Sequence, residues 1–251
     1  MYIGKAVKRR EDERFLLGRG NYVDDVVLPD MAYAAFVRSP HAHARNLSIN
    51  TSQALKLPGV RAVATADDLV ETVSKLSNIG ETIVDIREIA SNSLASDKVL
   101  YKGHAVAAVA ATSPHIAEEA LDLIEVNYET LPAVVDVREA IKDNAPLLDE
   151  KRTMQAMGED TGKHSNIATH NLFKLGDVEK GFSRADIILE RKYNNATIHQ
   201  GYIEPHNTTV HWKKDGSITV WVSTQGPFQI RAQLSDAVSY THLTLPTSDL
   251  V

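Results

Sequence analysis

The chain has 251 residues, enough for one large domain or two smaller ones, each with its own hydrophobic core. Hydrophobic residues make up 43% and charged residues 24%, which is ordinary for a globular protein, and no apolar run is long enough to span a bilayer. The net charge of -6 argues against nucleic acid as the main partner, because phosphate binding usually needs a basic face.

The chain contains no cysteine, so these residues hold no disulfide, cysteine nucleophile or cysteine-bound iron–sulfur cluster. The N-terminal stretch MYIGKAVKRREDERF lacks the apolar core of a secretory signal. Together these features lead us to expect a cytoplasmic protein.

The first half of the chain predicts short strands around one clear helix. Apolar alternation or small apolar runs predict strands over 31–39, 44–50, 60–66, 104–112 and 124–131. Thr51 is expected to cap a short helix that ends by Leu57, and Ser113 to cap a longer one with Pro114 as its first residue. The resulting strand–helix–strand unit favours a mixed layer of helices and strands.

The second half is less regular. MGEDTGKHSN (157–166) predicts a linker or surface loop, and a second region begins near Ile167. There, Asp177 is expected to cap a short helix. Strands are predicted over 185–195 and in a hairpin over 207–225, with a primed turn at Asp215-Gly216. A final helix begins near Pro227, with Phe228, Ile230 and Leu234 on its apolar side.

Three groups of polar residues are candidates for chemistry. His41 and His43 would share a face on a strand, as zinc ligands sometimes do, but a turn after Ser39-Pro40 is the favoured alternative. His199, His206 and His211 lie close in sequence without metal-site spacing. The densest polar stretch, IHQGYIEPHN (198–207), lies between two predicted strands, where loops often bind ligands.

Five segments, in this order, resemble one family: GRGNYVDDVVLPDMAYAAFVRSPHAHARNLSINTSQALKLPGVRAV, ASDKVLYKGHAVAAVAATSPHIAEEALDLIEVNYETLPAVVD, GDVEKGFSRADIILERKY, HQGYIEPH and VSTQGPF. The family is the large, molybdopterin-binding subunit of the xanthine dehydrogenase, aldehyde oxidase and carbon monoxide dehydrogenase type. The resemblance covers nearly all of residues 1–237. No single motif decides it, but the ordered set is specific.

The resemblance implies an α+β fold, with an α/β hammerhead domain followed by the start of a molybdenum-cofactor-binding α+β domain. It divides the chain into an N-terminal arm (1–14), the hammerhead domain (15–131), a linker (132–166) and the beginning of the first molybdopterin-binding domain (167–237). The predicted loop over 157–166 agrees with that division.

The resemblance also implies a molybdenum-cofactor-dependent oxidoreductase. Family members hydroxylate a carbon centre with oxygen from water, or oxidise carbon monoxide. The molybdenum is held by a pterin dithiolene, for which a bacterial protein would use the cytosine dinucleotide form. The implied partners are an iron–sulfur small subunit, an FAD-binding medium subunit and a small-molecule substrate. Purines, aldehydes, N-heterocycles and carbon monoxide all stay open as substrates.

The resemblance implies few site residues. In the xanthine dehydrogenase branch, a glutamine before a Leu-Glu-Thr segment lies beside the oxo group of the metal. Here Gln200 precedes the matching Ile-Glu-Pro, but about two positions too close, so His199 or Ile198 could take its place. Gln225 and Gly226 are implied on the cofactor side, with a plain turn as the alternative. No catalytic residue is expected here, because the glycine-rich cofactor loop and the base glutamate would follow.

The tail VSYTHLTLPTSDLV (238–251) resembles a translated sequencing adapter, whose transposase-type end encodes Val-Ser-Tyr-Thr-His-Leu-Thr-Leu-Pro-Thr. We therefore expect a non-native tail on a fragment that is inactive by itself. The alternative for the tail is a genuine C-terminal strand. The alternatives for the function are a non-enzymatic α+β binding module that uses the 198–207 loop and a histidine-based hydrolytic metal enzyme.

Overall fold

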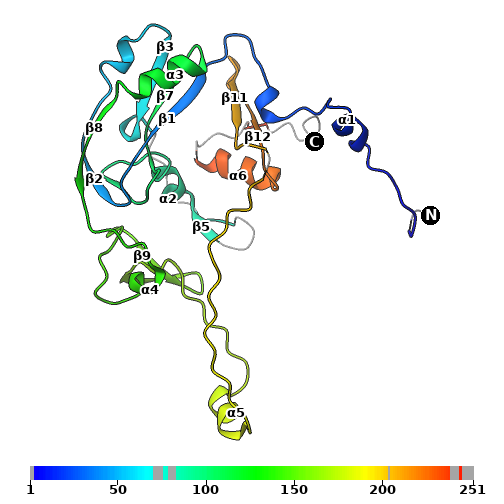
Figure 1. The fold of residues 1–251 in the computed structure, drawn as a ribbon, viewed down its shortest axis with the longest axis vertical. Coiled ribbons are helices and arrows are strands. Elements are labelled where there is room, and N and C mark those ends of the chain that lie inside the picture. Colours follow the sequence, from blue (N-terminus) through cyan, green and yellow to red (C-terminus); the bar gives the residue numbers. More distant parts are fainter. Residues whose placement is uncertain (1–2, 70–75, 79–82, 203, 238–242, 245–251) are drawn as a thin grey trace. The chain divides into compact units, whose positions relative to one another are not determined.

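A computed structural model describes residues 3–69, 76–78, 83–202, 204–237 and 243–244 (Figure 1). The chain divides into two compact units, residues 1–132 with 204–251, and residues 133–203. The helices of the first unit are α1 (Asp12–Leu16), α2 (Ile86–Ser91), α3 (Pro114–Leu121) and α6 (Pro227–Ala237), with short 3-10 turns η1 (Val23–Asp25), η2 (Ala54–Lys56) and η3 (Ala66–Asp68). No helix in the described residues is long and apolar enough to cross a membrane.

In its described residues, the first unit contains three small three-stranded sheets and one two-stranded hairpin. Its strands are β1 (Tyr33–Arg38), β2 (Ala44–Asn50), β3 (Val60–Thr65), β4 (Leu76–Asn78), β5 (Ile83–Asp85), β6 (Lys98–Val99), β7 (Ala105–Ala111), β8 (Glu125–Thr130), β11 (Thr208–Trp212), β12 (Ile218–Val222) and β13 (Leu243–Thr244). The sheet orders are β1-β7-β3, β6-β2-β8 and β11-β12-β13. Their pairs are antiparallel except β12 with β13, which are parallel. Strands β1, β2, β3, β7 and β8 confirm the five strands predicted for this part.

The core of this unit is built on both faces of β7. Ala107 and Val109 pack in one cluster with Ile124 and with Ala120 of α3, whereas Val106 packs in a second cluster with Ala44, Ala95 and Val99. In Figure 1, α3 lies beside β1, β7 and β3. Alanine and valine side chains are short, so a layer can approach β7 closely from each side. The continuous small apolar run of 104–112 is therefore the sequence of a strand buried on both faces.

One of the two predicted caps in this region is confirmed. The Ser113 hydroxyl accepts a hydrogen bond from the Ile116 N–H at 3.3 Å, and Pro114 begins α3. The Thr51 cap was wrong, because η2 is a single 3-10 turn whose N-cap, Gln53, makes no side-chain cap. The Asn50 side chain instead accepts from the Ser52 N–H at 3.1 Å, so a local turn competes with helix initiation.

The second unit contains α4 (Val137–Ala140), β9 (Thr153–Ala156), β10 (Glu159–His164) and α5 (Val178–Arg184). Asp177 caps α5 as predicted, since its carboxylate accepts from the Lys180 N–H at 3.0 Å. The loop predicted over 157–166 was wrong for β10, which pairs antiparallel with β9. All β10 side chains are exposed, so the strand has no apolar alternation that the sequence could show.

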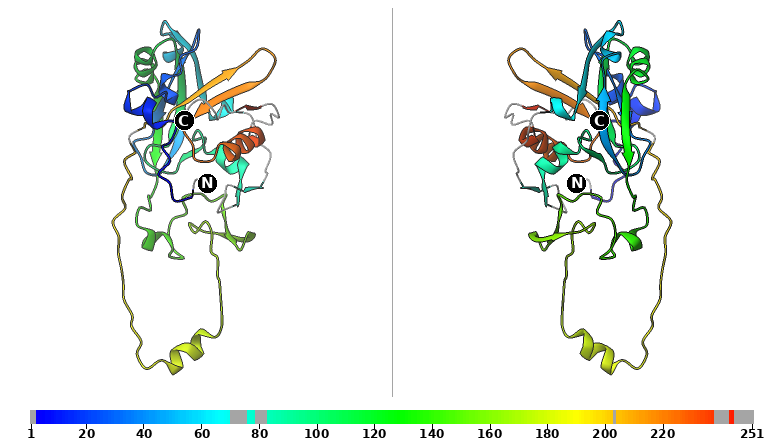
Figure 2. Two further views of the ribbon diagram at one scale, coloured as in Figure 1. Left: turned by 90° about the vertical axis from the view of Figure 1, so that its right-hand side faces the viewer. Right: turned by 90° about the vertical axis from the view of Figure 1, so that its left-hand side faces the viewer.

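The strand predicted over 185–195 was also wrong. The segment is extended but forms no ladder with any described residue, and Figure 2 shows it as a long connection after α5. Ile187 and Leu189 are 78% and 75% exposed. A strand needs a partner for its backbone groups, and alternating apolar residues alone do not supply one.

The hairpin of β11 and β12 is confirmed, but its turn differs from the prediction. Gly216 N–H donates to the Lys213 carbonyl at 3.0 Å, and Lys213 N–H donates to the Ser217 carbonyl at 2.8 Å. Within this turn only Gly216 has a positive φ, of 87°, so the primed turn was wrong. This is a turn with a bulge, in which the Asp215 carboxylate accepts from the Ser217 N–H and needs no positive φ of its own.

Helix α6 begins at Pro227 as predicted and packs beside this hairpin. Leu234 contacts the cluster of Ile218 and Val220 on β12. Phe228, which the sequence placed on the apolar side, is instead 79% exposed. Leu234 therefore covers β12, whereas Phe228 in the first turn faces solvent.

Candidate functional site

The predicted cofactor-contacting residues lie in both units. Gln200 is exposed in the second unit, in a turn where Gly201 N–H donates to His199 Nδ1 at 3.0 Å. Gln225 and Gly226 lie in the first unit, between β12 and α6. Gln225 and Gly226 are consecutive residues of one turn, and their role as cofactor contacts stays a prediction.

The link between β12 and α6 is a turn held by side chains. Thr224 Oγ1 accepts a hydrogen bond from the Gly226 N–H at 3.1 Å, and the Gly226 carbonyl accepts from the Ile230 N–H at 3.0 Å in the first turn of α6. Gln225 is exposed at the tip of this turn. The 223–226 turn therefore presents one amide side chain beside a residue with no side chain.

The 223–226 turn is also hydrogen-bonded to the segment that precedes β11. Ser223 Oγ donates to Glu204 Oε1 at 2.9 Å, and both residues are half-buried. The hairpin ladder ends at the Thr208–Val222 pair. The Ser223–Glu204 bond therefore joins the two segments that flank the hairpin, beyond their last backbone pairing. Sequence reasoning missed it, although both residues lie in segments that carry the family resemblance.

The segment that precedes β11 is held by a second side-chain hydrogen bond. The Asn207 side-chain amide donates to the Asp24 carboxylate of η1, and Thr209 is buried in β11. Residues 204–209 are thus held at Glu204 by Ser223, at Asn207 by η1 and from Thr208 onward by the hairpin ladder.

The candidate metal ligands do not assemble into a site. His41 and His43 lie in the bend between β1 and β2, which agrees with the turn alternative. His43 is buried, and its Nδ1–H donates to the Pro132 carbonyl at 2.8 Å. The His41 ring meets the Tyr128 ring edge-on at 5.0 Å. Among the residues that the structure describes, no three histidine, aspartate or glutamate side chains are placed to hold a metal ion.

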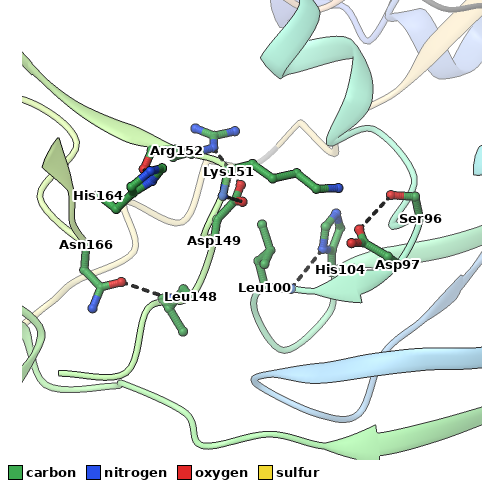
Figure 3. A network of polar contacts seen from close by, with 10 residues as sticks. All are labelled: Ser96, Asp97, Leu100, His104, Leu148, Asp149, Lys151, Arg152, His164 and Asn166. Carbon is green, nitrogen blue, oxygen red and sulfur yellow. Dashed lines mark hydrogen bonds and ion pairs between the residues drawn. The ribbon is translucent and has the colours of Figure 1, made fainter. Parts of the chain in front are cut away.

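His104 is a buried histidine that sequence reasoning did not single out. The Leu100 N–H donates to its Nδ1 at 3.2 Å (Figure 3), so Nε2 carries the proton and donates it to the Asn92 carbonyl at 3.1 Å. The ring stacks on Tyr101 at 4.5 Å. Burial lowers the pKa of His104 below 6.5, and the hydrogen bond to Asn92 opposes this only in part. The neutral ring therefore has a structural role, because its two hydrogen bonds connect Leu100 with Asn92.

The polar contacts of the second unit also serve its fold. The Asn166 side chain accepts from the Leu148 N–H at 3.0 Å, and Arg152 pairs with Asp149 at 3.1 Å (Figure 3). Asp136 caps α4, and its hydrogen bonds from Arg138 lower the pKa of its carboxyl to about 2. These groups hold loops and a helix end in place.

Two known domain families match this chain. Residues 17–132 match the aldehyde oxidase and xanthine dehydrogenase a/b hammerhead domain, and residues 160–244 match the molybdopterin cofactor-binding domain. The predicted fold class, a hammerhead domain followed by the start of a cofactor-binding domain, is therefore confirmed.

Individual relatives give the same result. The carbon monoxide dehydrogenase large chain of Afipia carboxidovorans is 38% identical over 240 residues, which cover 93% of this chain and 28% of that protein. The nicotine 6-hydroxylase large subunit of Paenarthrobacter nicotinovorans is 32% identical over 235 residues, or 93% of this chain and 27% of that one. The structure of reconstituted CO dehydrogenase from Oligotropha carboxidovorans matches with a TM-score of 0.78 at 33% identity, over 96% of this chain and 30% of that chain. This chain thus spans less than a third of each of these relatives.

Proposed function

The chain belongs to the xanthine dehydrogenase and carbon monoxide dehydrogenase family, as part of its molybdopterin-binding large subunit, and from this premise we propose that the whole protein is a molybdenum-cofactor-dependent oxidoreductase. It would hydroxylate a carbon centre with oxygen from water, or oxidise carbon monoxide. The observation that carries the proposal is the presence, in this order on one chain, of the hammerhead and molybdopterin-binding domain families.

Residues of the 223–226 turn fit a pterin cofactor. The Gln225 amide offers both a donor and an acceptor, is exposed, and makes no hydrogen bond to any residue that the structure describes. Gly226 lies against the Gln229 side chain, whose Oε1 is 2.6 Å from the place that a Cβ would take, so the turn has no room for a side chain at this position. We propose Gln225, Gly226 and Gln200 as cofactor contacts and the cytosine dinucleotide as the pterin form. The bound cofactor supplies the oxygen-transfer and redox chemistry, and these residues hold and orient it.

The proposed partners are an iron–sulfur subunit and an FAD-binding subunit, in a cytoplasmic complex. Relatives are named as a carbon monoxide dehydrogenase large chain and as subunit gamma of a dehydrogenase complex, which supports a multi-subunit assembly. Residues 1–251 contain no cysteine to hold an iron–sulfur cluster, so electrons would have to leave through another chain or segment. Copurification of the tagged full-length subunit from the cytoplasmic fraction of its source cells tests both points.

The activity is tested with the full-length subunit and its partners. We expect about one molybdenum per large subunit and dye-linked oxidation of carbon monoxide, an aldehyde, a purine or an N-heterocycle. Residues 1–251 alone should not turn over any of them. A purified complex that contains no molybdenum would overturn the proposal. Binding of such a molecule by residues 1–251 without molybdenum would instead favour the non-enzymatic binding module.

A further inference from the structure

The Glu204–Ser223 hydrogen bond connects two segments that backbone pairing does not. Glu204 precedes β11 and Ser223 follows β12, and the ladder between those strands stops at Thr208 and Val222. Between Glu204 and β11, the chain is held by the Asn207–Asp24 bond. The chain close to Glu204 is therefore held at Asn207, and the Glu204 carboxylate links this held segment to Ser223.

Fixing Ser223 also fixes the residues that follow it. Only Thr224 separates Ser223 from Gln225, and the Thr224 hydroxyl holds the Gly226 N–H. The Gly226 carbonyl then receives the Ile230 N–H at the start of α6. The path from β12 to α6 is thus set by one side-chain bond at each of two successive residues, Ser223 and Thr224, and Gln225 follows them directly.

From this arrangement we propose that Glu204 is a positioning residue, which orients the Gln225 side chain toward the pterin cofactor through Ser223. The inference rests on the proposed function, because it takes Gln225 to be a cofactor contact. Glu204 itself would not touch the cofactor. The acceptor is a carboxylate, and a hydrogen bond to a charged group is stronger than one between neutral groups, which suits a link that must hold an exposed turn.

The bond between Glu204 and Ser223 predicts a specific pattern among variants of the full-length subunit in its complex. Glu204→Ala and Ser223→Ala each remove the bond, so each should lower pterin content and the affinity of the cofactor-free complex for added cofactor by about three- to tenfold. The double variant should lose no more than either single variant, because both act through the same bond. Glu204→Gln keeps an acceptor oxygen for Ser223 and should recover most of the loading.

Hydrogen exchange separates this inference from the proposed function. In the cofactor-free complex, Glu204→Ala should speed exchange at the Gly226 and Ile230 amides and leave the Val210 and Val220 amides of the hairpin unchanged. Glu118→Ala is the matched control, because Glu118 is exposed on α3 and its side chain makes no hydrogen bond or ion pair with a described residue. It should change neither exchange nor loading.

Two results in a complex whose wild type carries the pterin would overturn the inference. One is normal pterin loading in Glu204→Ala, in a complex whose wild type is loaded. The other is additive losses in the double variant, because independent effects would mean that Glu204 does not act through Ser223. If the wild-type complex contains no pterin while Glu204→Ala still loosens Gly226 and Ile230, the turn is confirmed and the proposed function fails, which also overturns the cofactor role of Glu204.

Discussion

At the scale of single residues, the buried imidazole of His104 couples stability to pH. Burial lowers the pKa of this ring below its usual 6.5, so the folded state keeps it neutral where the unfolded state already binds a proton. Stability therefore rises with pH between the lowered value and 6.5, and it is lost as the pH falls through that window. Protonation would also remove the acceptor at Nδ1 that the Leu100 N–H uses.

We predict that His104→Gln flattens this pH dependence. Glutamine keeps a donor and an acceptor but does not titrate, so the free energy of unfolding of the variant should fall less than that of the wild type between about pH 8 and about pH 5. Urea unfolding at several pH values measures this. Parallel pH profiles for the two proteins would contradict the prediction.

At the scale of elements, Gly59 decides how the chain passes from η2 into β3. Its φ is +95°, and a Cβ at this position would lie 2.7 Å from Ile116 Cδ1 and 2.8 Å from Thr112 Oγ1. The Gly59 carbonyl also accepts from the Thr112 N–H at 2.9 Å, so the backbone cannot shift without losing that bond. Both the conformation and the space at residue 59 therefore require glycine.

We predict that Gly59→Ala destabilises the fold more than Gly103→Ala does. Gly103 has a similar φ of +90° but no heavy atom within 4 Å of an added Cβ. Each substitution should lose about 1–2 kcal/mol from backbone strain, and Gly59→Ala should lose more because of its clash with α3. Thermal unfolding of both variants gives the comparison, and equal losses would mean that α3 moves aside freely.

At the scale of the whole molecule, resistance to proteolysis should differ along the chain. Residues 185–202 form no strand ladder with any described residue, and apolar side chains such as Ile187 lie open to solvent. Proteases cut segments of this kind, because cleavage needs backbone that is free of ladder bonds.

We predict that limited proteolysis of the 251-residue chain cuts first between residues 185 and 202, while residues 15–131 survive as a resistant fragment. Mass spectrometry of the time course identifies the cuts. Equal resistance of the two regions would contradict the prediction and would mean that the second region packs without further sequence.

The non-native origin of the tail over 238–251 also stays a prediction. The structure describes only Leu243–Thr244 of it, which pair in parallel with Ile218–Thr219, and the match to the molybdopterin-binding domain family runs to residue 244. We predict that source DNA, sequenced without a transposase-made library, continues past the Ala237 codon into a glycine-rich segment. DNA that encodes SYTHLTLPTSDLV and then a stop would show the tail to be genuine.

The sequence by itself determined the elements whose causes are local. The small apolar run of β7 predicts a strand buried on both faces, and Ser113 with Pro114 begins α3 as any serine and proline at those helix positions would. The ordered family segments likewise predicted both domain types, because each segment carries its own pattern.

Only the tertiary structure decided the features that depend on a distant partner. β10 is a strand because β9 pairs with it, whereas residues 185–195 have the pattern of a strand and no partner among the described residues. Glu204 and Ser223 are 19 residues apart in the sequence, and their side chains meet only because the hairpin between them has formed. Sequence patterns record which face of an element is apolar and where it is capped. Pairing depends on which backbone and side-chain groups folding brings within hydrogen-bonding distance.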